Sequence, residues 1–238
     1  MKSQQDERRF AFREHGYFVV PVFLTQAELE ALRPECDALL ARVRAQSRVK
    51  GHISPSVSLL DGAAKLDAAT GLGQVLAFLC SARVCALLDG LAQADEVLAP
   101  RLKKADYYHE QTQHDWDGDW HRDSQFTEYD PERERALLSS TTFVHVRFAL
   151  EDDDRLEIVP GSQRRWDTRE ELGIRKGSAR ASAAMPGAKR VALRARDACV
   201  FHAGSIHRAT YRRAPIRRTL DALYVFGPPT PKQRWLSE

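Results

Sequence analysis

Two short segments hold the side chains best suited to chemistry. Trp120-His121-Arg122-Asp123 contains a His-x-Asp pair, and His207 follows 86 residues later. On a β-strand, residues i and i+2 point to the same face, so this pair would present an imidazole beside a carboxylate. Two histidines and one carboxylate on one face of an iron ion form the facial triad of non-heme Fe(II) oxygenases, which leaves positions open for chemistry. A His-x-Asp pair is common by chance, so its surroundings must support this interpretation.

The third ligand of such a triad must come from a different strand. His207 is the best candidate because it follows the strand-like run 198–202, which would belong to the same β-core. Two further histidines, His145 and His202, are predicted to be structural. His145 lies in an alternating strand, and His202 would face away from His207, which favours packing or a hydrogen bond.

The helices and strands that are predicted to position these residues fall into a helical N-terminal part and a β-rich remainder. Residues 1–95 are predicted to be mainly helical, with helices over 6–15, from the Thr25 capping box onward and over 73–93, and with a short strand at 17–21. Short runs rich in Val, Phe, Tyr, Thr and Leu follow near 97–108, 141–150, 156–159, 190–194, 198–203 and 219–226. Many short strands separated by turns predict a jelly-roll β-core over 96–238, buttressed by the helices, in a single α+β domain. Residues 163–189 show no period and are predicted to form a mobile loop or lid.

Composition limits the class of protein. The 238 residues are 43% hydrophobic and 29% charged, which suits one domain with a sizeable core. The net charge is only +3, and the basic residues occur in pairs rather than in the continuous stripe of nucleic-acid binders. The sequence contains no run of about 18 apolar residues, so no membrane span is predicted. The expected partner is therefore a small molecule, and the sequence indicates no oligomeric state.

The four cysteines fit neither a zinc-site spacing nor a C-x-x-C pattern, so they are predicted to be reduced thiols. The first residues are polar and charged, with no apolar run behind them, and no signal peptide is evident. Together these features predict a cytoplasmic protein.

An ordered set of segments resembles the phytanoyl-CoA dioxygenase-like family of Fe(II)/2-oxoglutarate oxygenases. The matching segments are residues 14–25, the W-H-x-D at 120–123, 156–162 with their Pro-Gly-Ser turn, 201–207 and 217–220. The resemblance implies a double-stranded β-helix core with His121, Asp123 and His207 as iron ligands. It also implies that Arg218, eleven residues after the distal histidine, holds the distal carboxylate of 2-oxoglutarate through its planar fork. The adjacent Arg217 would face the other way on a strand and is the natural competitor.

The chain departs from the family pattern at several positions. Gln163 stands where a histidine usually follows Pro-Gly-Ser, and Asp154-Arg155 stands where Asn-Gly is common. Arg196 replaces the glycine that usually precedes Asp197, which predicts an altered turn. The carboxylate of Asp123 is present, which disfavours halogenation and favours hydroxylation or a related oxidation.

The resemblance therefore implies an enzyme that uses Fe(II), 2-oxoglutarate and O2 to hydroxylate a small polar metabolite or biosynthetic intermediate, releasing succinate and CO2. Desaturation, cyclisation and epimerisation remain open. A zinc-type hydrolase or lyase on a similar barrel would use the same triad with an activated water and would not need Arg218. A non-catalytic β-barrel binding module would keep its binding after the loss of His121.

Overall fold

The chain was analysed as a computed structural model that describes residues 3–46, 56–59, 73–92, 99–109, 115–126, 128, 130–140, 143–178 and 181–226. The first residues of the strands expected near 97–108 and 141–150 lie outside this part of the chain.

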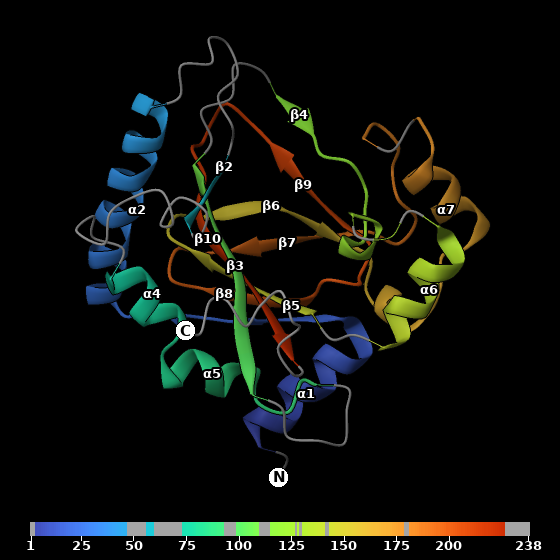
Figure 1. Ribbon diagram of the computed structural model, residues 1–238, viewed down its shortest axis with the longest axis horizontal. Helices are drawn as coiled ribbons and strands as arrows, with labels where there is room; N and C mark the ends of the chain where they lie inside the picture. Colours follow the sequence, from blue (N-terminus) through green and yellow to red (C-terminus); the bar gives the residue numbers. More distant parts are fainter. Residues whose placement is uncertain are drawn as a thin grey trace.

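Two antiparallel sheets form the β-core (Figure 1). The larger sheet has the order β1 (Tyr17–Val20), β8 (Ala198–His202), β5 (Phe143–Ala149), β10 (Arg218–Phe226), β3 (Pro100–His109) and β2 (Ser56–Ser58). The smaller sheet has the order β4 (Trp116–Asp117), β9 (His207–Tyr211), β6 (Asp153–Ile158) and β7 (Lys189–Leu193). This is the double-stranded β-helix that the sequence predicted. Three of its strands, β2, β4 and β9, were not predicted.

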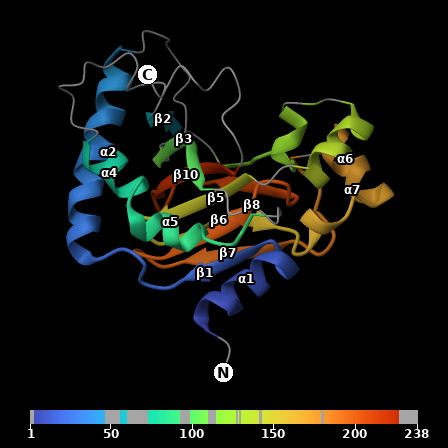
Figure 2. The same ribbon diagram turned by 60° about the horizontal axis from the view of Figure 1, so that its bottom comes forward.

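Helices cover the outer face of the larger sheet (Figures 1 and 2). They are α1 (Gln4–His15), α2 (Gln26–Gln46), α4 (Gly73–Leu79) and α5 (Ala82–Leu88). The run 73–93 is two short helices rather than one, because the Ser81 hydroxyl accepts a hydrogen bond from the Val84 N–H and starts the second helix there. The predicted capping box begins α2, where Thr25 and Glu28 bond each other's backbone N–H groups.

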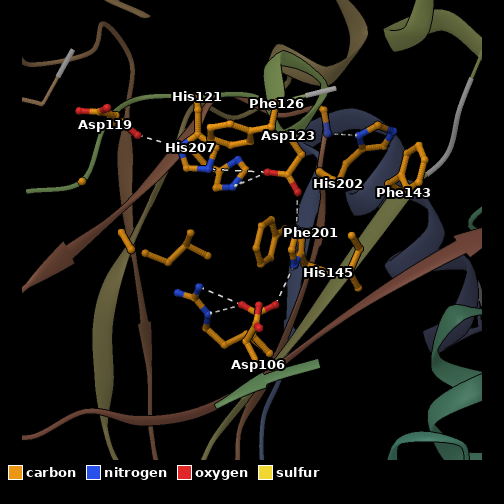
Figure 3. Close-up of a pocket in the computed structure, with 18 of the residues that line it drawn as sticks. Asp106, Asp119, His121, Asp123, Phe126, Phe143, His145, Phe201, His202 and His207 are labelled. Atoms are coloured by element: carbon orange, nitrogen blue, oxygen red, sulfur yellow. Dashed lines mark hydrogen bonds and ion pairs between the residues drawn. The ribbon is translucent and has the colours of Figure 1, made fainter. Parts of the chain in front are cut away.

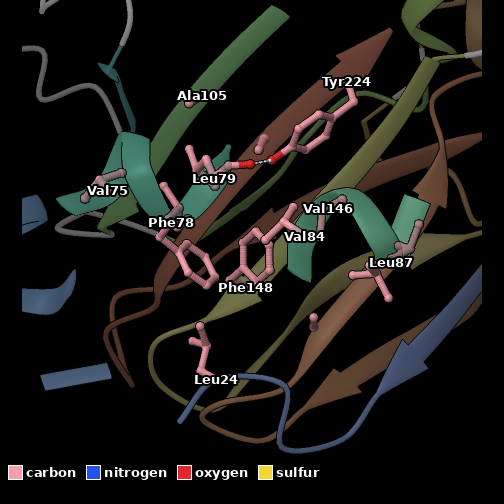
Figure 4. Packing of buried hydrophobic residues seen from close by; sticks show 14 of the residues in the cluster. Leu24, Val75, Phe78, Leu79, Val84, Leu87, Ala105, Val146, Phe148 and Tyr224 are labelled. Atoms are coloured by element: carbon pink, nitrogen blue, oxygen red, sulfur yellow. Dashed lines mark hydrogen bonds between the residues drawn. The ribbon is translucent and has the colours of Figure 1, made fainter. Parts of the chain in front are cut away.

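The side chains of β5 alternate between the hydrophobic core under the helices and the space between the two sheets. Val144, Val146 and Phe148 are fully buried against the helices, and Phe148 packs against Phe78 of α4 (Figure 4). His145 and Arg147 point the other way and line a cavity between the sheets. The period of two along a strand therefore assigns the apolar positions to the core and the polar positions to the interior of the barrel.

The end of α1 is joined to β8 and to the short 3₁₀ helix η3 (Ser162–Arg164). Gly16 ends α1 in the left-handed region, at φ 80°, and its carbonyl accepts a hydrogen bond from the His202 N–H. The Gln163 amide donates to the carbonyls of Phe12 and Arg13 at the end of α1. The glutamine that departs from the family pattern thus binds carbonyls in the last turn of α1, where the Phe12 carbonyl also accepts the Gly16 N–H.

Two expectations need correction. Residues 163–189 are not an irregular loop throughout, because they contain α7 (Arg169–Lys176), which begins with a capping box between Thr168 and Glu171. Arg196 does not alter its turn: the residue adopts φ 81°, in the region that glycine favours, and its Nε donates to the Leu24 carbonyl at 2.8 Å. The helix α6 (Pro131–Ser140), which contacts the short 3₁₀ helix Asp123–Phe126, was also not predicted.

Candidate functional site

A cavity of about 1020 Å³ lies between the two sheets and is lined by residues of both. Tyr108 of β3, His145 of β5 and Asp221 of β10 come from the larger sheet, and His207 and Tyr211 of β9 come from the smaller one. A cavity of this size, enclosed by a rigid β-core, is typical of a small-molecule site.

His121, Asp123 and His207 converge in this cavity (Figure 3). One ligand atom from each lies within 4.8 Å of the others. The His121 and His207 Nε2 atoms are 3.6 Å and 3.5 Å from the same Asp123 oxygen, Oδ1. The residues whose types suggested a metal site are therefore brought together by the fold.

The local backbone differs from the simple strand that the His-x-Asp spacing suggested. His121 forms an isolated bridge to His207, the first residue of β9, and Asp123 begins the short 3₁₀ helix η2 (Asp123–Phe126). The Asp123 N–H is held by the Ala203 carbonyl at 3.0 Å. The bridge places the two imidazoles side by side, and the turn directs the carboxylate toward them.

Main-chain carbonyls set the tautomer of both imidazoles. His121 Nδ1 lies 2.7 Å from the Asp119 carbonyl oxygen, and His207 Nδ1 lies 2.9 Å from that of Ser205. A carbonyl can only accept, so each Nδ1 carries a proton and each Nε2 faces the shared position. An imidazole oriented in this way can offer its Nε2 to a metal ion.

The electrostatics of the site agree with this arrangement. Burial and the neighbouring His121 imidazole lower the pKa of His207 to about 3 against the opposing effect of Asp123, so the ring stays neutral at physiological pH. Burial would raise the pKa of Asp123, but the imidazoles of His145, His207 and His121 hold it below its usual value. The electrostatics therefore favour a neutral nitrogen at His207 and an ionised carboxylate at Asp123.

A histidine that the sequence suggested was structural also reaches this site. His145 Nε2 lies 2.7 Å from Asp123 Oδ2, and its Nδ1 lies 2.7 Å from Asp221 Oδ1. Burial opposes a charge on His145, but the two carboxylates raise its pKa to about 10. The alternation of β5 could have placed His145 in the interior, but its partners depend on pairing between strands distant in sequence. His202 fits its predicted role, because its Nδ1 accepts from the Gly204 N–H and its ring packs near Phe12.

The fold does not bring Arg218 to the three ligands. It shares the face of β10 that carries the buried Leu220, and its guanidinium lies 3.4 Å from carboxylate oxygens of Asp37 and Glu151. Arg217 lies on the other side, the side of Asp221. Its side chain is 1% exposed, and its guanidinium carbon lies 4.7 Å and 5.2 Å from the ring centres of the cavity-lining residues Tyr108 and Tyr211.

The residue between the two N-terminal ligands secures the segment that carries them. Arg122 is fully buried, binds Asp167 Oδ1 at 2.7 Å and donates to the Ser162 carbonyl at 2.9 Å and to the Gly204 carbonyl. Asp167 also binds Arg175 of α7, which in turn binds Glu134 of α6. We call these four residues, all with fully buried side chains, the buried ion cluster. It ties α6 and α7 to the 121–123 segment.

Comparison with known families identifies the family to which the chain belongs. The family model of phytanoyl-CoA dioxygenase (PhyH) matches residues 12–219. The chain belongs to the phytanoyl-CoA dioxygenase family. Membership in this family makes it an enzyme of the Fe(II)/2-oxoglutarate oxygenase type, with O2 as co-reactant. The convergent donor set fits iron, since two imidazoles and one carboxylate are the ligands that such enzymes offer.

Solved structures of this family's fold agree. EctD from S. alaskensis with bound Fe superposes with a TM-score of 0.67 at 15% identity, covering 94% of this chain and 76% of that one. AviO1 from Streptomyces viridochromogenes Tue57 gives a TM-score of 0.66 at 18% identity, covering 97% and 100%. SnoN, an α-ketoglutarate-dependent epimerase from nogalamycin biosynthesis, gives 0.61 at 20% identity, covering 92% and 81%. At these identities the likeness shows the fold, and no curated protein matches by sequence.

None of the helices in the described part of this family member has the length and apolar character needed to cross a bilayer.

Proposed function

We propose that this chain is a hydroxylase in which His121, Asp123 and His207 hold Fe(II). The observation that carries the proposal is the convergence of the two Nε2 atoms on one oxygen of Asp123, at 3.6 Å and 3.5 Å. Bound iron would supply the activation of O2 coupled to oxidation of 2-oxoglutarate to succinate and CO2. The residues supply the rest: imidazoles oriented by main-chain carbonyls, an ionised carboxylate and a cavity between the two sheets that holds the reacting groups together.

The distal carboxylate of 2-oxoglutarate needs a guanidinium, and we propose Arg217 for this role in preference to Arg218. Arg217, the residue before β10, lies against two tyrosines of the cavity, whereas Arg218, the first residue of β10, faces Asp37 and Glu151. The spacing of eleven residues from His207 favoured Arg218, but adjacent residues at the start of a strand are directed to opposite faces. This difference of one residue supports Arg217 as the residue that binds the cosubstrate.

The cavity supports a substrate with both polar and apolar parts. Lys104, Asp106, Arg147 and Asp221 line it together, while Trp116, Phe126 and Leu137 are cavity-lining apolar side chains that remain substantially exposed, at 40%, 61% and 36%. Apolar surface gathered at one site marks a place where a ligand binds. We therefore propose a metabolite that carries polar groups, as expected from the sequence, together with an apolar portion that contacts this surface. A reducing, cytoplasmic location is proposed with it.

The iron site is tested by anaerobic titration of the apo-protein with Fe(II) and then 2-oxoglutarate, following the weak visible charge-transfer band of the chelate. Wild type is expected to give the band and Asp123→Ala is expected to lose it. Arg217→Met should raise the 2-oxoglutarate concentration needed by roughly tenfold to a hundredfold, because a charge-assisted bond is lost. Arg218→Met is the matched control.

Each alternative outcome has a clear meaning. A band that depends on Arg218 and not on Arg217 would return the carboxylate site to the position indicated by spacing. A folded protein that gives no band would favour a zinc-type hydrolase or lyase, or a binding module without catalysis.

Hydroxylation is separated from epimerisation by labelling. SnoN is an epimerase of the same fold, so the fold alone does not fix the outcome. Candidate substrates are screened by succinate release and then turned over with isotopically labelled O2. Hydroxylation places one labelled oxygen atom in the product, whereas an epimerised product without label would contradict the proposal.

A further inference from the structure

The two oxygens of Asp123 have different surroundings. Oδ1 lies toward the Nε2 atoms of His121 and His207, at 3.6 Å and 3.5 Å. Oδ2 lies 2.7 Å from His145 Nε2, on the side away from the two ligand imidazoles (Figure 3). One oxygen is thus directed to the metal position while the other is engaged by a donor.

Two further contacts hold the His145 ring in place. Its Nδ1 lies 2.7 Å from Asp221 Oδ1, and its ring stacks on Phe201 at a centroid distance of 4.7 Å and an angle of 8°. Asp221 Oδ2 accepts two hydrogen bonds from Arg147, at 3.0 Å and 2.9 Å. These residues come from β5, β8 and β10, which are hydrogen-bonded neighbours in the larger sheet. The donor that reaches Asp123 is therefore fixed by the sheet rather than by a flexible loop.

We propose that His145, oriented by Asp221, is a positioning residue that restricts Asp123 to binding the metal through Oδ1 alone. A carboxylate with both oxygens available can bind a cation in bidentate fashion. A second bound oxygen would occupy a position that the cosubstrate or O2 needs. The hydrogen bond from His145 engages Oδ2 and so keeps that position open. The inference rests on the proposed metal site, but not on the identity of the substrate or the reaction.

The test uses Co(II) alone as a spectroscopic probe of the apo-protein, since the intensity of its visible bands falls as coordination number rises. His145→Phe retains a flat ring against Phe201 but removes the donor to Asp123. It is expected to weaken Co(II) binding by roughly 10- to 100-fold, as loss of a residue that orients a metal ligand typically does, and to lower the band intensity. His145→Gln retains an N–H donor and is expected to keep most of the wild-type spectrum.

A matched control and a second variant guard against loss of folding. His109→Phe makes the same change at another buried imidazole, at the end of β3 and outside the lining of the cavity, and should leave the spectrum unchanged. Asp221→Asn leaves His145 in place but weakens its anchor. It should shift affinity and intensity in the same direction as His145→Phe, by a smaller factor.

The outcomes separate this inference from the metal site itself. If wild type binds Co(II) and His145→Phe and Asp221→Asn give the wild-type affinity and spectrum, His145 does not position the ligand. If His145→Gln fails as badly as His145→Phe while folded, the hydrogen bond is not what matters and the inference is also overturned. If wild type binds no Co(II), it is the proposed metal site that fails.

Discussion

Gly16 occupies a position with no room for a methyl group. Its φ is 80°, and a Cβ there would lie 2.5 Å from Gln163 Oε1 and 2.6 Å from Ser205 Oγ. Gly16→Ala should therefore lower the free energy of unfolding by more than the roughly 1–2 kcal/mol that a left-handed conformation costs an L-residue. Urea denaturation measures the difference.

A second glycine supplies the control for this change. Gly187 has φ 70° but open space where a methyl group would lie. Gly187→Ala should show the conformational cost alone, and Gly16→Ala combined with Gln163→Ala should recover part of the steric cost. Equal losses for the two single variants would mean that the contacts around Gly16 yield without cost.

At the scale of elements, the buried ion cluster determines how α6 and α7 attach to the metal-ligand segment. Arg175 lies 2.7 Å from Glu134 Oε1 and 2.6 Å from Asp167 Oδ2, and all three side chains are fully buried. Arg175→Met would leave Asp167 bound to Arg122 and Glu134 bound to Lys176 but would remove the charge-assisted hydrogen bonds that join them, so we expect a loss of roughly 1.5–3 kcal/mol in the free energy of unfolding.

An exposed pair provides the comparison for the cluster. Arg194 lies 2.9 Å from Asp152, with side chains that are 85% and 59% exposed. Arg194→Met should cost at most about 1 kcal/mol, as exposed ion pairs do. A loss in Arg175→Met no larger than in Arg194→Met would show that the cluster does not stabilise the attachment of α6 and α7.

The start of α7 also makes a pH-dependent contribution. Burial would raise the pKa of Glu171, but hydrogen bonds from Arg165 and Thr168 outweigh it and lower the pKa from 4.5 to about 2. A carboxyl whose pKa is lower in the folded state stabilises the protein above its unfolded pKa, and this contribution disappears as the pH falls through the folded value. The stability difference between wild type and Glu171→Gln should therefore shrink between about pH 4.5 and pH 2, as followed by urea denaturation. A difference that stays constant over this range would contradict the pKa assignment.

At the scale of the whole molecule, metal binding at the proposed site would be linked to folding, because the three proposed ligands come from segments that only the folded chain brings together. Co(II) at a hundredfold excess over its dissociation constant should raise the free energy of unfolding by about 2.7 kcal/mol. Thermal or urea denaturation with and without a chelator measures the effect. Asp123→Ala should abolish it, and an equal increase in that variant would mean that the ion binds elsewhere.

Local sequence patterns predicted those elements that interactions between residues close in the sequence determine. The alternating run at 143–149 and the capping box at Thr25 became β5 and the start of α2. The strand β9 was missed because His207-Arg208-Ala209-Thr210-Tyr211 lacks an apolar stripe and is stabilised by pairing with β4 and β6. The helices α6 and α7 were not predicted. Charged residues in a sequence usually indicate a solvent-exposed segment, whereas those of the buried ion cluster are buried.

The residues of the candidate site also fall into those that the sequence indicated and those that it did not. His121, Asp123 and His207 were identified by residue type and spacing, and the fold brings them together. His145 was not identified, because its bonds to Asp123 and Asp221 depend on register between β5 and β10 and on the turn at η2. The choice between Arg217 and Arg218 likewise depends on which face of β10 points inward, a property that a spacing counted along the chain does not contain.

Both ligand imidazoles are oriented by carbonyl oxygens of the main chain, those of Asp119 and Ser205. Every amino acid has that carbonyl, so the side chain at position 119, which lines the cavity, can diverge while the orientation of His121 is inherited unchanged. Drift at position 119 is thereby free to reshape the neighbouring wall of the cavity, whereas Ser205 is fully buried beside Gly16 and has no such freedom. A lineage can in this way explore new substrates without first losing its metal.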